Sequence, residues 1–263
     1  MTLRPPVVAR GAGERPPVAA PARSLAANFR DVVIRPAATF RDVARRPRWL
    51  APLVAVTLAS VIVALLGWPT MARIVRETMP ELGPGAPPGL EALTLGSALM
   101  AAILGPLVGT PLGISICGVL LWGWARLTGA GGARLDGAVA AIAFVSLIGV
   151  FSSVADVVAL ILFPEAVDPV GIPVVKPLSL AALFESGEIT LPLHAALGHV
   201  SVFSLWWAAL LVVAGTHALG MSRGAAIGFA ALAWVAMGVL IVLGASLSGL
   251  GAAGQLPGAP IAL

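Results

Sequence analysis

Residues 49–68 read WLAPLVAVTLASVIVALLGW, an apolar run without a charged side chain that begins and ends with tryptophan. As an α-helix, this run places Trp49 and Trp68 about 28 Å apart, which matches the ~30 Å hydrocarbon core of a bilayer. Tryptophan favours the membrane–water interface, because its ring is apolar and its N–H needs a polar partner. The stretch therefore predicts a first membrane span with an anchor at each end.

Composition extends that prediction to the whole chain. Of the 263 residues, 59% are hydrophobic and 11% are charged, whereas soluble proteins have roughly 45–50% and about 25%. So few charges cannot cover the surface of a soluble fold, and the single cysteine, Cys117, excludes an intramolecular disulfide. We expect an all-α, polytopic membrane protein with five transmembrane helices, at about residues 49–68, 92–125, 138–163, 200–219 and 224–248.

The second apolar run, residues 92–127, has no charge before Arg126. A straight helix of that length would measure about 54 Å, too long for one crossing. Pro106 and Pro111 each remove a backbone donor, which favours one long helix kinked near the prolines. The alternatives are two shorter spans or a broken helix of the transporter kind. Small residues spaced four apart let another helix approach, so packing within the fold, or a homo-oligomer contact, is expected at Gly105, Gly109 and Gly113.

Basic residues indicate the orientation of these spans. Ten of the sixteen lie in the first 48 positions, and Lys and Arg near span ends favour the cytoplasmic side. With five spans and a cytoplasmic N-terminus, thirteen basic residues lie inside and three outside. Dividing residues 92–127 into two spans would instead send Arg126, Arg134 and Arg223 outward. We therefore predict the N-terminus inside the cell and the short uncharged tail, residues 250–263, outside it.

The segment before the first span divides into two parts. Residues 1–23 are rich in Pro, Ala and Arg and lack the apolar core of a signal peptide, so we predict a disordered cytoplasmic tail. Residues 24–48 contain two short amphipathic patterns separated by Pro36, and Thr39 is a candidate N-cap for the second. Such helices suit the membrane–water boundary, and their pattern predicts an amphipathic interfacial segment.

Arginines cluster at the end of that segment. Next to an anionic bilayer, each arginine gains roughly 1 kcal/mol. Because the cluster adjoins a membrane span, we expect anionic lipids as its partner and no nucleic acid; the alternative is that the arginines only set the orientation. The residues concerned are Arg41, Arg45, Arg46 and Arg48.

Few side chains suggest chemistry. Asp156 lies in the third apolar run, where a carboxylate indicates a helix-end or helix–helix hydrogen bond, or else a proton or ion site. His194, His199 and His217 do not converge on a metal ion within one helix, although His199 could meet Asp156 near the outer face. A serine protease would need a serine such as Ser246 beside a histidine, and its surroundings lack a nucleophile turn. We assign no catalytic, cofactor-binding or metal-binding residue.

Four stretches together resemble the Ypt-interacting-protein (Yip) domain family. They cover most of residues 25–250 and are TFRDVARRPRW (39–49), LLWGWARLTGAGGARLDGAVAAIAFVS (120–146), LSLAALFES (178–186) and SVFSLWWAALLVVAGTHALGMSRGAAIGFAA (201–231). The resemblance implies a five-span membrane domain over residues 49–249, a cytoplasmic N-terminus, a short helix before the fourth span and no catalytic residues. Eukaryotic members of the family bind small GTPases in vesicle traffic.

The resemblance and the residues together favour a non-enzymatic scaffold or adaptor with an unidentified protein partner on the cytoplasmic side. The Pro-, Ala- and Arg-rich composition is typical of bacteria, which predicts a multi-pass protein of the bacterial inner membrane. The first alternative is a small transporter or channel component that uses the kinked second span and Asp156. The second is an intramembrane hydrolase.

Overall fold

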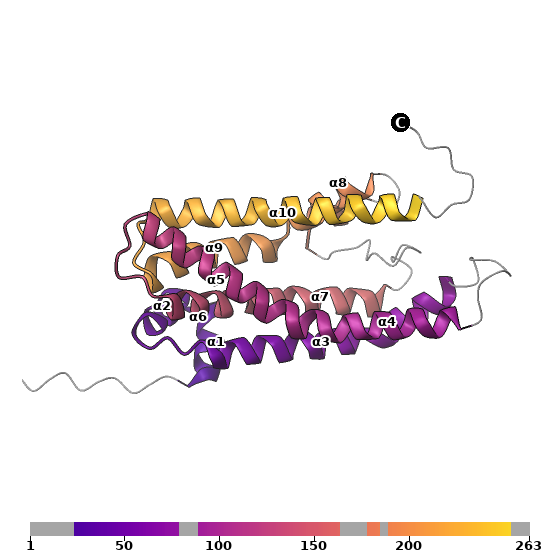
Figure 1. The fold of residues 1–263 in the computed structure, drawn as a ribbon, viewed down its shortest axis with the longest axis horizontal. Coiled ribbons are helices and arrows are strands. Elements are labelled where there is room, and N and C mark those ends of the chain that lie inside the picture. Colours follow the sequence, from indigo (N-terminus) through magenta and orange to yellow (C-terminus); the bar gives the residue numbers. More distant parts are fainter. Residues whose placement is uncertain (1–23, 79–88, 164–177, 185–188, 254–263) are drawn as a thin grey trace, which may run out of the picture.

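The computed structural model of the chain describes residues 24–78, 89–163, 178–184 and 189–253, so the predicted tails lie wholly or largely outside the described residues. Where it is described, the fold consists of helices joined by short connections. The helices of the bundle lie along its long axis (Figure 1), some over its whole length and others over part of it. They are α3 (Leu50–Thr78), α4 (Leu90–Leu104), η2 (Gly105–Gly109), α5 (Thr110–Leu127), α6 (Leu135–Val145), α7 (Leu147–Leu162), α9 (Val202–Ala218) and α10 (Arg223–Ala253).

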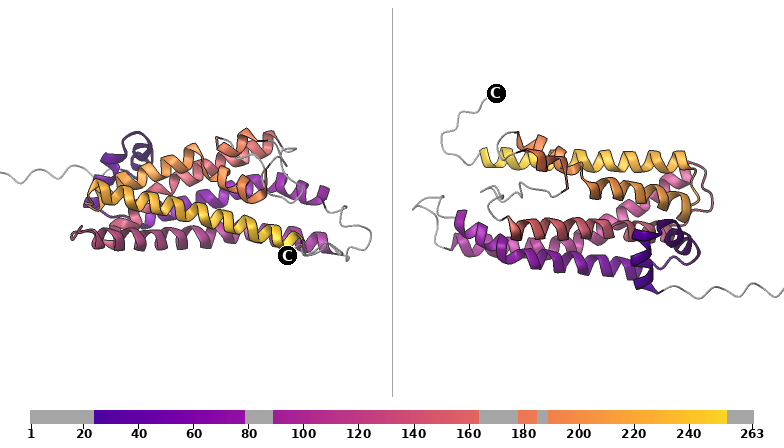
Figure 2. Two further views of the ribbon diagram at one scale, coloured as in Figure 1. Left: turned by 90° about the horizontal axis from the view of Figure 1, so that it is seen from above. Right: turned by 180° about the vertical axis from the view of Figure 1, so that it is seen from behind.

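Within the described residues, the chain passes along the bundle five times. The passes are α3, the rod α4–η2–α5, the pair α6–α7, then α9 and α10 (Figures 1 and 2). Four of these passes are long and apolar enough to cross a membrane, and α9 is a shorter apolar helix of 17 residues. At 1.5 Å per residue, α9 is about 26 Å long, close to the thickness of the hydrocarbon core. The chain is therefore a multi-pass, all-helical membrane protein.

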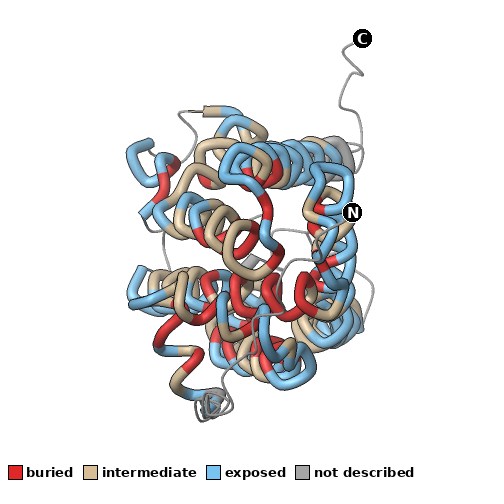
Figure 3. Tube along the Cα trace, turned by 90° about the vertical axis from the view of Figure 1, so that its left-hand side faces the viewer, coloured by how far each residue is buried: buried red, intermediate tan, exposed pale blue. Residues whose placement is uncertain are grey.

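Apolar side chains cover the outside of this bundle. Leu66, Leu93 and Leu240 are exposed by 63%, 70% and 64%, and Figure 3 shows exposed residues around the bundle with buried ones toward its centre. In water such a surface would be strongly unfavourable, whereas lipid tails are as apolar as leucine. The outer surface is thus suited to lipid.

The second pass is one continuous helical rod, as the kinked-helix interpretation expects. Its turns widen to π-helix at Gly105–Gly109, the segment that contains Pro106. Proline has no N–H to donate to the preceding turn, and π-helical turns accommodate such a defect without ending the helix. The bend in the rod between α4 and α5 is visible in Figure 1.

Three other helix limits differ from the sequence interpretation. Helix α3 continues through Pro69 to Thr78, ten residues beyond the predicted end of the first span at residue 68, so Arg73 and Arg76 lie on this helix. The third pass breaks at Ser146, whose hydroxyl donates a 2.9 Å hydrogen bond to the carbonyl of Ile142. Before the fourth pass, a 3₁₀ turn at Leu180–Leu183 occupies part of the expected short helix, and a further helix, α8 (Leu191–His199), follows it.

Helix α6 forms the centre of the fold. Its alanines are fully buried, and it packs against α3, α5 and α9. The closest approach is at Gly118 of α5, where an added Cβ would lie 2.7 Å from Cγ2 and 3.0 Å from Cα of Val139. Small side chains thus let α5 and α6 meet almost backbone to backbone.

Candidate functional site

Two short helices precede the first span. Helix α1 (Leu25–Ile34) is capped by the Ser24 side chain, which accepts a hydrogen bond from the backbone N–H of Ala27. Helix α2 (Pro36–Arg45) begins with proline at its first turn, where proline's missing N–H costs nothing. The prediction that Thr39 caps the second helix is therefore wrong: Thr39 lies inside α2 and is fully buried.

The apolar stripes of α1 and α2 are docked on one end of the bundle, against α6 and α9. Val32, Phe40 and Val43 are buried, and the ring of Phe29 lies 5.5 Å from that of Phe144 in α6. The two helices therefore use their apolar faces to contact protein, while their arginines remain exposed. Exposed arginines form what we call the arginine cluster, which consists of Arg41, Arg45, Arg46 and Arg48.

The arginine cluster lies at the same end of the bundle as two other basic connections (Figure 1). One joins α5 to α6 and is flanked by Arg126, in the last turn of α5, and Arg134, just before α6; the other joins α9 to α10 and ends at Arg223, the first residue of α10. Trp124 links the end of α5 to the start of α10, because its Nε1 donates a 2.9 Å hydrogen bond to the carbonyl of Ala225. The end opposite carries the turn before α4 and helix α8.

A groove opens between the start of α3, the last turns of α5 and the start of α6. Its volume is about 730 Å³, and its walls include Trp49, Val119, Trp122 and Val139. Arg126, Arg134 and Asp136 lie along it as well. The groove thus combines an apolar wall with charged groups.

A second cavity, which we call the inner cavity, lies between α7, α8, α9 and α10, farther from the arginine cluster. It has a volume of about 360 Å³ and is lined by Asp156, His199, Trp207 and Trp234, together with the hydroxyl-bearing residues Ser152, Ser153, Ser201 and Ser204. The structure therefore brings Asp156 of α7 and His199 of α8 to the walls of one cavity, although they lie 43 residues apart in the chain.

His199 is held against α10. Its Nε2 lies 2.9 Å from the carbonyl oxygen of Trp234, and the two rings are 4.8 Å apart. Gly238 makes room for this arrangement, since a Cβ there would lie 2.9 Å from Cδ2 of His199. The imidazole therefore bridges α8 and α10. This structural contact also fixes the position of one wall of the inner cavity.

The transporter hypothesis joined Asp156 with the kinked second span, and the structure separates them. The inner cavity is lined by residues of α7–α10 and of the α8–α9 connection, whereas η2 packs against α3. Ser246, the serine weighed for a hydrolase, donates a 2.9 Å hydrogen bond to the carbonyl of Val242 in its own helix. Among the described residues, no three His, Cys, Asp or Glu side chains group as metal ligands would.

Comparison with known protein families tests the family resemblance that the sequence suggested. The family model of the Yip1 domain matches residues 30–244, from α1 to α10. The chain belongs to the Yip1 domain family. No curated protein and no solved structure matches it.

The family match covers the second half of α1, all of α2 and the bundle, and in this Yip1 domain α1 and α2 pack against α6 and α9 of the bundle. The family resemblance drawn from the sequence is confirmed. The Yip1 family is not a known enzyme family, and no catalytic role passes to the chain from it.

The glycine ladder of this Yip1 domain faces outward. A Cβ added at Gly105, Gly109 or Gly113 would meet no atom within 4 Å. The expected close packing of the ladder within the fold is therefore wrong: Gly118, five residues beyond Gly113, is the glycine that α6 approaches. The ladder is left on the outer surface of the bundle.

Sequence interpretation missed the groove and the role of Trp234. Trp122 and Arg126 are four residues apart, and a helix therefore places them on one face, which was a readable signal. Trp234 offered none, because its contact with His199 joins residues 35 apart in the chain.

Proposed function

We propose that this Yip1-domain protein is a non-enzymatic scaffold or adaptor in the cell (inner) membrane of a bacterium. The docked pair α1–α2 carries the proposal: its buried face holds it on the bundle, so its basic face is presented at a fixed place. A fixed surface can bind a partner without the entropy cost of ordering a free segment. The partner we propose is a protein on the cytoplasmic side, aided by anionic lipids at the arginine cluster.

The orientation belongs to the same proposal. The arginine cluster, Arg126, Arg134 and Arg223 gather at one end of the bundle, and basic connections favour the cytoplasm. We expect a reporter fused after Leu263 to be active only outside the cytoplasm. Cytoplasmic activity there would overturn the orientation.

Site-specific photocrosslinking in intact membranes tests the scaffold. A crosslinker at Arg45, exposed on α2, should yield a discrete protein adduct, because that position faces the proposed partner. The same group at Leu66, exposed on the outside of α3, serves as the matched control and should yield lipid adducts. Lipid adducts alone at both positions would refute the scaffold.

The inner cavity supports a second candidate function, a small transporter or channel component. A carboxylate, an imidazole and several hydroxyls line one half-open cavity between α7, α8, α9 and α10, and ionisable groups within membrane helices commonly mark ion pathways. Asp156→Asn separates the two functions. The scaffold predicts an unchanged Arg45 crosslink and no change in proton or ion flux across proteoliposomes, whereas the transporter predicts loss of a coupled flux.

The outward glycine ladder supports a homo-oligomer as a further element of the scaffold. Small residues at this spacing suit a helix–helix contact, and the surface around them is open. We expect Gly109→Leu to reduce self-association in detergent, with Gly96→Leu, also open on α4, as the control. Equal self-association of both variants and the native chain would contradict a contact at the ladder.

A further inference from the structure

We propose that the groove between α3, α5 and α6 binds one anionic phospholipid, with its phosphate at Arg126 and an acyl chain along α5. This site is distinct from the arginine cluster and does not depend on the scaffold role. Three features of the groove fit such a lipid: the charge at one end, the tryptophans around that charge and the length of the apolar wall.

Arg126 is oriented by neutral groups. Its guanidinium carbon lies 5.9 Å from the centre of the Trp122 ring, and one of its terminal nitrogens donates to the carbonyl of Gly131. Among the described residues, these contacts hold the side chain without neutralising its charge. A planar guanidinium presented in this way can donate two parallel hydrogen bonds to a phosphate.

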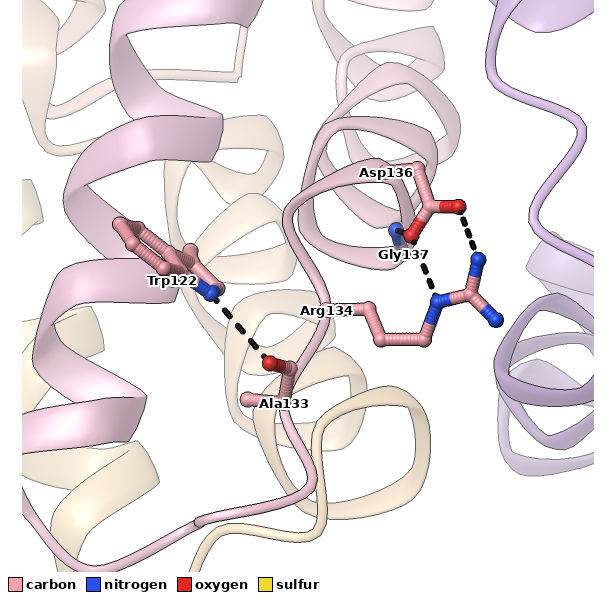
Figure 4. Close-up of polar contacts among 5 residues, drawn as sticks. All are labelled: Trp122, Ala133, Arg134, Asp136 and Gly137. Carbon is pink, nitrogen blue, oxygen red and sulfur yellow. Dashed lines mark hydrogen bonds and ion pairs between the residues drawn. The ribbon is translucent and has the colours of Figure 1, made fainter.

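Arg134 and Asp136 form an ion pair beside Arg126, so that the net charge of the site stays positive. Nε and a terminal nitrogen of Arg134 donate to the Asp136 carboxylate at 3.1 and 2.7 Å, and the same carboxylate accepts a 2.8 Å hydrogen bond from the N–H of Gly137 (Figure 4). Asp136 is thus engaged with Arg134 and the start of α6. Two guanidinium groups and one carboxylate leave one positive charge at the mouth of the groove, complementary to a single phosphate.

Two tryptophans set the depth of this mouth in the membrane. The Nε1 of Trp122 donates a 3.3 Å hydrogen bond to the carbonyl of Ala133 (Figure 4), which fixes the ring beside Arg126. Trp49 lines the groove from the start of α3. Because tryptophan concentrates at headgroup level, the mouth lies where lipid phosphates are.

The rest of the groove matches an acyl chain. It extends along α5 from Arg126 to Ser115, and eleven residues of helix measure about 16 Å. Half of a ~30 Å hydrocarbon core is about 15 Å, so the groove runs from the headgroups to near the midplane. Val119 and Val139 line it between these ends. A free phosphate or an acidic peptide would leave this wall unused, and a phospholipid covers it.

The experiment measures lipid binding to the full-length protein in nanodiscs of phosphatidylcholine, titrated with phosphatidylglycerol. Native mass spectrometry counts the lipids retained per protein. We expect one retained phosphatidylglycerol and about tenfold weaker retention in Arg126→Gln, because one charge-assisted contact is lost. Arg223→Gln, which removes an exposed arginine at the same end of the bundle, should bind as the native protein does.

A second variant tests the apolar wall separately from the charge. Val119→Trp fills the groove while leaving Arg126 in place, and should weaken retention of the long-chain lipid without affecting binding of inorganic phosphate. The proposal is overturned if Arg126→Gln or Val119→Trp retains phosphatidylglycerol as the native protein does. It is also overturned if phosphatidylcholine is retained equally, or if inorganic phosphate displaces the lipid at similar concentration, which would indicate a simple anion site.

Discussion

Replacing Gly118 by alanine tests the helix contact at the centre of the fold. Gly118 lies on α5, facing α6, and the new methyl group would lie 3.0 Å from Cα of Val139, where ordinary contact begins at 3.4 Å. The nearer obstacle, Cγ2 of Val139 at 2.7 Å, belongs to a side chain that can rotate. The backbone of Val139 cannot rotate away, so α5 and α6 must separate.

The change in stability caused by Gly118→Ala is the balance of two opposing effects. Inserting a methyl group into a tightly packed contact costs about 1–3 kcal/mol, and alanine in place of glycine returns up to about 1 kcal/mol of helix propensity. Gly123→Ala is the matched control, because Gly123 lies in the same helix and a Cβ there would meet no atom within 4 Å. The propensity effect cancels between the variants, so Gly118→Ala should be less stable than Gly123→Ala by about 1–3 kcal/mol.

Reversible unfolding of the purified protein in mixed micelles, titrated with sodium dodecyl sulfate and followed by circular dichroism, measures this difference. Adding Val139→Ala to Gly118→Ala removes the obstructing methyl group but leaves the backbone of α6 just as close, so it should restore stability only in part. If Gly118→Ala and Gly123→Ala agree within about 0.5 kcal/mol, the close approach of α5 and α6 is refuted.

Three further variants probe other contacts. Phe40→Ala removes a fully buried ring and should weaken docking of α2 by about 3–5 kcal/mol. The measurement is the rate of tryptic cleavage near Arg41, which should rise in Phe40→Ala and stay unchanged in Ile34→Ala, a control at an exposed residue. Gly238→Ala should displace the His199 ring from Trp234 and shift the tryptophan emission; an unaltered spectrum would contradict this contact. Trp124→Phe removes the hydrogen bond from α5 to the start of α10 and should cost about 1 kcal/mol in the same micelle titration, while full native stability would show that the bond contributes nothing.

The sequence was sufficient to predict a helical membrane protein, because the transfer free energy of a helix into lipid depends mainly on its own residues. The tryptophans of residues 49–68, the prolines of the second pass and the Yip stretches are all local signals. The same holds for the amphipathic pattern of residues 24–48, which correctly indicated two short helices with apolar stripes. It could not indicate whether the apolar face meets lipid or protein, since both are apolar.

Which helix faces pack together could be learned only from the tertiary structure, because lipid and protein interior are both apolar. In water, a helix marks its inner face by hydrophobicity, whereas in lipid the inner and outer faces are equally apolar and the pattern loses that information. The glycine ladder and Gly118 look alike in sequence, yet only Gly118 meets a neighbouring helix. Asp156 and His199 likewise share a cavity because of the tilt and rotation of α7 and α8. Residue types thus determined that the chain crosses the membrane, and the rotation of each helix about its axis decided which side chains meet.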